Sequence, residues 1–219
     1  MRPSTPEGIL LVLAMAHTCA LAQEPVTVTV IDCANAPPAV MRTAVATARN
    51  AFALTQGNFR WVIGNRGQCD EPQPNSNFEV LVMPRLRGPL NARGEVRAAG
   101  YVMPTGFDRP RAYAFLDAAR TAAERTTRPV DEVLGCILIH EVGHLLGLGH
   151  QPHGAMRAQL EGLEMDRATS GRAFTGEEAR QLRLALSRLG IARIAGKGGN
   201  SGAPGGLVIS GLDLTEPKE

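Results

Sequence analysis

Aromatic residues, net charge and long apolar runs are all scarce in this chain of 219 residues. Only 4% of the residues are aromatic, so the stacking platforms that bind single-stranded nucleic acids are not expected. The formal charge is only +2, which predicts neither a nucleic-acid binder nor a binder of anionic membrane surfaces. The length is sufficient for one domain with a sizeable core. We therefore expect a single globular domain with no nucleic-acid partner.

A short apolar run near the N-terminus has the features of an export signal. Arg2 gives a weak positive start, residues 9–16 are apolar, and Ala20-Leu21-Ala22 is a small-x-small cleavage site. The run is too short to span a bilayer, and no later stretch is apolar enough to do so. We interpret residues 1–22 as a signal peptide, with an uncleaved membrane anchor as the alternative. The mature protein is then expected to be exported, either periplasmic or secreted, with no membrane span.

Cysteine is also rare, and its few positions predict one disulfide. Removal of the signal takes Cys19 away and leaves Cys33, Cys69 and Cys136. An oxidising compartment favours one disulfide and one leftover thiol. Cys33 follows an expected strand and Cys69 lies in a polar loop, so this pair is the disulfide candidate. Cys136 falls in an apolar helix, where a buried structural role is favoured over a nucleophile paired with a histidine.

Apolar patterning predicts a mixture of strands and helices. β-branched or apolar runs predict strands over residues 26–31, 59–63 and 78–83. A helix is expected from Pro37-Pro38 to about Gly57, because proline is tolerated in the first turn and apolar residues then recur at helical spacing. Two further short strands are expected on either side of a turn. These two strands are residues 98–103 and 112–116, and the turn is residues 104–106.

The second half of the chain is predicted to be mainly helical. A short helix or turn is expected over residues 118–125, and a buried helix begins at Pro129. The segment 157–172 is polar, with part of a helix near its middle. Thr175 is expected to cap a last helix, since Glu178 stands three residues later as in a capping box. Residues 196–219 are rich in glycine and are predicted to be a flexible tail.

One motif in the buried helix predicts a metal centre. The motif is His140-Glu141-Val142-Gly143-His144-Leu145-Leu146-Gly147-Leu148-Gly149-His150. His140 and His144 are four residues apart, so on a helix they share one face and can bind one metal ion. Gly147 can take the positive φ that ends a helix, after which the chain can bring His150 to the same ion. Glu141 cannot be a ligand in that geometry and is placed to act on a metal-bound water. Three protein ligands with one open position are typical of a catalytic zinc site.

These residues resemble the signature of the metzincin clan of zinc endopeptidases, H-E-x-x-H-x-x-G-x-x-H followed by a Met-turn. Met156, six residues after His150, is the Met-turn candidate, and this short spacing is similar to that of compact bacterial matrixin-like members. The resemblance implies an α+β catalytic domain over residues 23–195. Its twisted mixed sheet would pack on the active-site helix, and a small helical subdomain would follow.

The resemblance also implies chemical roles. His140, His144 and His150 would bind one catalytic Zn2+ ion, and Glu141 would be the general base that hydrolyses peptide bonds. The substrate would be a protein or peptide, and one of the two short strands would be an edge strand that pairs with it.

Some assignments stay open at this point. His153 is a rival third ligand, although the spacing in the clan favours His150. Arg157 stands where some relatives carry a tyrosine that stabilises the transition state, and neither Tyr101 nor Tyr113 is assigned that role. A zinc-binding protein without catalysis and a zinc amidase acting on cell-wall peptides are alternative functions. The oligomeric state is left open.

Overall fold

The computed structural model describes residues 24–85 apart from 65 and 67, residues 100–103, and residues 110–197 apart from 160. Side chains of the last helix are described as far as Leu189. The expected signal peptide (1–22), the turn at 104–106 and nearly all of the expected tail (196–219) lie outside the described residues.

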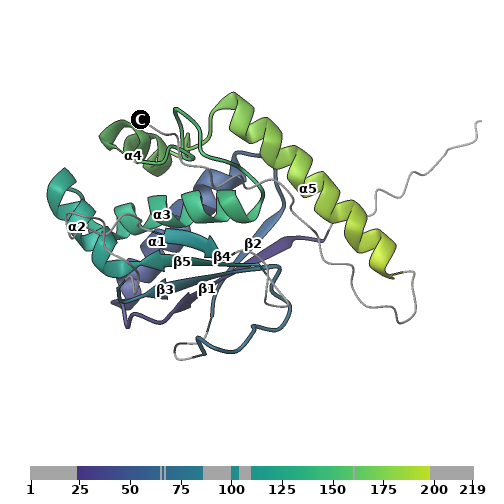
Figure 1. Cartoon of the computed structure of the whole chain (residues 1–219), viewed down its shortest axis with the longest axis horizontal. Helices are drawn as coiled ribbons and strands as arrows, with labels where there is room; N and C mark the ends of the chain where they lie inside the picture. Colours follow the sequence, from purple (N-terminus) through teal and green to yellow (C-terminus); the bar gives the residue numbers. More distant parts are fainter. Residues whose placement is uncertain are drawn as a thin grey trace, which may run out of the picture.

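The described residues form an α+β fold of five strands and five helices (Figure 1), which confirms the expected class. The strands are β1 (Val26–Asp32), β2 (Phe59–Ile63), β3 (Phe78–Met83), β4 (Gly100–Met103) and β5 (Arg111–Phe115). The helices are α1 (Pro38–Ala53), α2 (Leu116–Thr126), α3 (Val130–Leu145), α4 (Gly162–Thr169) and α5 (Gly176–Lys197).

The five strands form one mixed sheet in the order β2-β1-β3-β5-β4. The pairs β1–β2, β1–β3 and β3–β5 are parallel, and β4 pairs with β5 in the antiparallel direction. Strands β2 and β4 are therefore the edges. Of the two short strands considered as an edge, the structure selects β4 and places β5 inside the sheet.

Helix α3 is the central element of the core, as its sequence predicts. It packs against α1, α2 and the β3–β5–β4 part of the sheet, with α1 beside it (Figure 1). Twelve of its sixteen residues are buried, so it has no polar face toward solvent. Gly135 allows the close approach to α1, because a Cβ at this position would collide with Thr47. At the other end, Asp131 and Glu132 lie in the first turn, where acidic groups interact favourably with the helix dipole.

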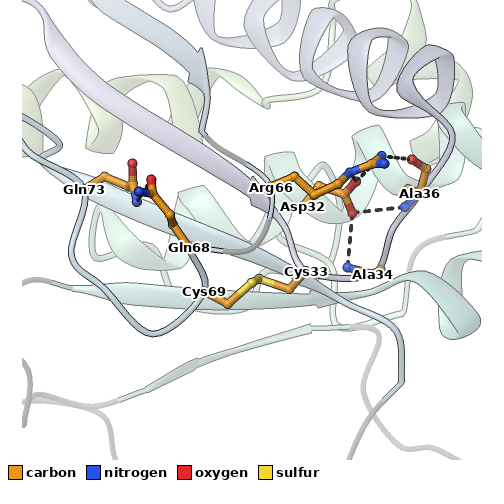
Figure 2. The surroundings of a disulfide bond; sticks show 8 residues. All are labelled: Asp32, Cys33, Ala34, Ala36, Arg66, Gln68, Cys69 and Gln73. Carbon is orange, nitrogen blue, oxygen red and sulfur yellow. Dashed lines mark hydrogen bonds and ion pairs between the residues drawn. A yellow bond between two sulfur atoms is a disulfide. The ribbon is translucent and has the colours of Figure 1, made fainter.

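The disulfide Cys33–Cys69 is present, as predicted, and it ties the end of β1 to the loop that follows β2 (Figure 2). A polar cluster reinforces the same connection. Asp32 Oδ1 accepts hydrogen bonds from the N–H groups of Ala34 and Ala36, each at 3.1 Å. Arg66 Nε donates to Asp32 Oδ2 at 3.0 Å, and Arg66 Nη2 donates to the Ala36 carbonyl at 2.6 Å.

The C-terminal helix α5 begins with the predicted capping box. The Glu178 N–H donates to Thr175 Oγ1 at 3.2 Å, and the Thr175 N–H donates to Glu178 Oε2 at 2.6 Å. Leu182 and Leu186 are buried, and Leu189 packs against the core. Throughout the described part of the chain, none of the helices combines the length and the apolar character needed to cross a membrane.

The disulfide is expected to stabilise the fold by constraining the unfolded chain. It closes a loop with a sequence separation of 36 residues, so the double variant Cys33→Ala/Cys69→Ala should lose about 3–4 kcal/mol of unfolding free energy. Urea denaturation measures this loss. Dithiothreitol should lower the stability of the natural protein and leave that of the double variant unchanged. An equal effect of the reductant on both proteins would contradict the prediction.

Candidate metal centre

The C-terminal turn of α3 sets the position of the motif. Leu148 N–H donates to the Gly143 carbonyl at 3.0 Å, and Gly147 N–H donates to the His144 carbonyl at 2.9 Å. This pair of bonds is a Schellman motif, and Gly147 has the positive φ of 85° that the motif requires. The helix therefore stops where the sequence predicts, and the chain turns back toward the face that carries His140 and His144.

The turn brings His150 to the two helical histidines. One ring nitrogen from each of His140, His144 and His150 lies within 4.8 Å of the other two. His140 is buried at 8% exposure, His144 is half-buried and His150 is exposed. Among the described residues, no other cluster of three or more histidine, cysteine or carboxylate side chains could hold a metal ion. The exposed His153 is not part of the His140–His144–His150 cluster. The geometry thus favours His150 over His153 as the third ligand.

Backbone carbonyls orient the two helical imidazoles. His140 Nδ1 is 2.8 Å from the Ala155 carbonyl, and His144 Nδ1 is 2.7 Å from the Leu148 carbonyl. Because a carbonyl oxygen only accepts, each Nδ1 carries the proton and each Nε2 presents its lone pair. The sequence contains no signal for these acceptors, since any residue supplies a carbonyl.

The arrangement of the Nε2 atoms fits a bound metal ion. Those of His140 and His144 are 3.0 Å apart, and two lone pairs at that distance repel unless a cation lies between them. Two imidazoles on a tetrahedral zinc ion, each at about 2.0–2.1 Å, would be roughly 3.3 Å apart. The two helical histidines could therefore hold a metal with little movement, and a ring nitrogen of His150 lies within 4.8 Å of both.

Burial also keeps the helical histidines in the form that a metal needs. It lowers the pKa of His140 to about 4, against a smaller opposing effect of the hydrogen bond to Ala155. Burial lowers the pKa of His144 in the same way. Both rings are therefore neutral near pH 7, and neutral imidazole is the ligand form.

Glu141 is a buried carboxylate that the protein leaves partly without partners. It is 3% exposed, and its Oε2 atom accepts no hydrogen bond from the described residues. Burial raises the pKa of Glu141 to about 8. A buried oxygen without a donor is costly, so this position is suited to a water molecule and a nearby cation.

The edge strand β4 passes directly beside Glu141. A Cβ at Gly100 would overlap the Glu141 carboxylate, so glycine is needed for this approach. Sequence reasoning identified the strand but not this contact, because Gly100 and Glu141 belong to no common motif.

Met156, the Met-turn candidate, packs against the second half of α3, next to Gly143. It is fully buried, and its Sδ atom fills the space that a Cβ at Gly143 would need. The surrounding loop is held by three hydrogen bonds, two between backbone groups and one to a side chain. Gln151 N–H donates to the Met156 carbonyl at 2.9 Å, Ala155 N–H to the Ala173 carbonyl at 2.9 Å, and Met156 N–H to Glu178 Oε1 at 2.9 Å.

Neither tyrosine lies on the side of the sheet that carries the site. Tyr101 stacks on Tyr113 with ring centroids 4.8 Å apart, and alternation along β4 places Tyr101 on the opposite face from Gly100. Arg157, directly after Met156, is engaged with acidic side chains, at 3.0 Å from Glu161 and 3.4 Å from Glu164. These ion pairs hold the segment between the metal centre and α4.

In comparisons with known proteins, no family model matches this chain, and no curated protein matches its sequence. The geometry of the site is therefore the basis for the function proposed below.

Cys136 is expected to be inert in the folded protein. Its side chain is buried, and burial raises the pKa of the thiol to about 12, so almost no thiolate exists at neutral pH. For protein that begins at Gln23, a thiol reagent such as DTNB should report no fast-reacting thiol in the native state. One thiol per chain should react in guanidinium chloride. Rapid labelling of the native protein would instead support a reactive cysteine.

The close approach of Gly100 and Glu141 predicts a strong energetic coupling. Gly100→Ala should lower the unfolding free energy by about 1–3 kcal/mol through overpacking, as measured by urea denaturation. Adding Glu141→Ala removes the overlapping carboxylate, so the double variant should recover at least half of that loss. Gly162→Ala is the control, because a Cβ there meets nothing within 4 Å. Additive losses in the double variant would refute the contact.

Proposed function

We propose that this protein is an exported zinc-dependent endopeptidase of the metzincin type. His140, His144 and His150 would bind the metal, and Glu141 would be the general base. One observation carries this proposal: three imidazole nitrogens converge, and the residue directly after His140 is a buried carboxylate that has an unpartnered oxygen. A site built only to hold a metal has no need of that carboxylate. The disulfide and the lack of a membrane-crossing helix among the described residues are compatible with export.

The donor set favours zinc. Three neutral imidazoles with room for a further ligand are the protein part of a catalytic zinc site. When bound, zinc supplies a Lewis acid that polarises a substrate carbonyl and makes a water molecule more acidic.

Glu141 then performs the proton transfers. Its carboxylate takes a proton from the attacking water as the new C–O bond forms. It returns this proton to the amide nitrogen as the C–N bond breaks, which releases a free amine and a carboxylic acid. A divalent charge beside Glu141 favours its ionised form, opposing the effect of burial. The protein holds the base rigidly, because Glu141 is enclosed between α3 and β4.

The edge strand supplies a place for an extended substrate. Strand β4 has one partner, β5, and its other edge is unpaired within the described sheet. An extended peptide can add to such an edge through backbone hydrogen bonds. Because Gly100 lies against Glu141, a peptide in that position would present its backbone close to the base.

Zinc content and proteolysis together test the proposal. The purified protein should contain one zinc ion per chain and should cleave an unstructured protein such as casein. Glu141→Ala should keep the metal and lose roughly 10²–10⁴-fold in cleavage rate. Glu132→Ala, which changes a carboxylate in the first turn of the same helix, should cleave normally.

A matched pair of variants tests which histidine is the third ligand. His150→Ala should weaken zinc binding, measured by competition with a chelating dye, whereas His153→Ala should not. The reverse pattern would show that the ligand assignment is wrong.

The same measurements separate the alternative functions. Zinc without cleavage of casein, but with hydrolysis of a cell-wall peptide amide, would favour an amidase. Zinc with no hydrolysis of either substrate, and no effect of Glu141→Ala, would favour a binding protein. Absence of zinc after gentle purification and attempted reconstitution would refute the metal centre itself.

A further inference from the structure

Glu178 is a buried carboxylate whose position is not explained by helix capping alone. It is 1% exposed, and within the described part of the chain no basic side chain forms an ion pair with it. Its two oxygens accept different backbone N–H groups. Oε2 accepts from Thr175, which is the capping box, and Oε1 accepts from Met156 at 2.9 Å. The second bond reaches outside α5, to a residue 22 positions earlier in the chain.

The peptide group between Ala155 and Met156 links this carboxylate to a proposed metal ligand. Its N–H donates to Glu178 Oε1 at 2.9 Å, and its carbonyl accepts the Nδ1–H of His140 at 2.8 Å. The two bonds therefore act on opposite ends of one amide. A negative charge that accepts from the N–H shifts electron density toward the carbonyl oxygen, which becomes a stronger acceptor.

We propose that Glu178 is a positioning residue of the metal centre. It acts on His140 through the Ala155–Met156 peptide, fixing the ring orientation and increasing the basicity of Nε2. Partners beyond the ligands often have this effect, whether they are carboxylates or backbone carbonyls. In this protein both kinds of partner are present, because the Glu178 carboxylate binds one end of the peptide group and the Ala155 carbonyl at its other end binds His140. Only the effect on metal affinity rests on the proposed zinc site, because the hydrogen bond to His140 exists without metal.

The local structure is adapted to this connection. Gly154 has a positive φ of 86°, and a Cβ there would overlap the Glu178 carboxylate. The N-terminus of α5 favours a negative charge at Glu178 through the helix dipole. One residue thus caps the helix and holds the loop of the metal centre. By contrast, His144 donates to Leu148 within its own turn, and that carbonyl has no link to Glu178.

A neutral substitution tests the connection. Glu178→Gln keeps the shape of the side chain and removes its charge. In the metal-free protein, NMR should show the Nδ1–H proton of His140 moving upfield while that of His144 stays in place. Zinc affinity, measured by competition with a chelating dye, should fall on the order of tenfold. Glu177→Gln is the matched control, since it removes the same charge from an exposed position in the same helical turn.

A second variant separates capping from the effect on His140. Thr175→Ala removes the hydroxyl that accepts from the Glu178 N–H but keeps the carboxylate, so zinc affinity and the His140 signal should be retained even if stability falls. If Glu178→Gln does not fold, Glu178→Asp provides the test. It keeps the charge but draws the carboxylate back from the Met156 N–H, so the His140 Nδ1–H signal should again move upfield while that of His144 stays in place.

Several results would overturn the proposal. A folded Glu178→Gln protein with an unchanged His140 signal would do so, as would equal shifts of His140 and His144 together with general loss of stability. A folded Glu178→Asp protein with an unchanged His140 signal would also contradict it. If the protein binds no zinc, the zinc site is refuted, and the NMR comparison alone decides the role of Glu178.

Discussion

Burial of helix α3 on almost every side is the constraint on which the site depends. The helix packs between α1, α2 and the sheet, and its second half carries two histidines and a glutamate into the core. Desolvation makes charged forms unfavourable there, which lowers the pKa of His140 and raises that of Glu141. The same packing holds these side chains in fixed positions. A rigid, mostly dry site is what a preorganised metal centre requires.

The cost of burying these polar groups is offset mainly by the backbone. The Schellman turn after α3 supplies the Leu148 carbonyl to His144, and the loop before α4 supplies the Ala155 carbonyl to His140. That loop is in turn held by Ala173 and Glu178. The orientation of the imidazoles therefore depends on segments that are distant in sequence, including the first turn of α5. This network leaves Glu141 Oε2 without a hydrogen-bond donor among the described residues, and in the proposed function that oxygen belongs to the general base.

The sheet contributes to the site through its edge. Strand β4 reaches α3 because Gly100 has no side chain to oppose the Glu141 carboxylate. The antiparallel pairing with β5 leaves the other edge of β4 without a partner in the described sheet. In the proposed function, the base and the place for an extended substrate thus lie next to each other because Gly100 lets β4 approach Glu141.

The sequence by itself determined the parts that local rules govern. The helical spacing of His140 and His144, the turn at Gly147, the capping box of α5, the first three strands and the α+β class are all features of short segments. They follow from periodicity and turn chemistry. The Cys33–Cys69 pair was also predictable, because few cysteines were available. The expected place of His150 followed from the turn at Gly147, and the metzincin resemblance supplied Met156 as the Met-turn candidate.

Only the tertiary structure decided which strand is the edge, which carbonyls accept from the imidazoles, and which groups approach Glu141. These contacts join Gly100 to Glu141 and Glu178 to His140 across many residues of chain. Carbonyl groups and glycines have no distinctive side chain, so the sequence carries no local signal for them. Their positions are fixed by how α3, β4 and α5 pack together, and packing is a property of the whole fold.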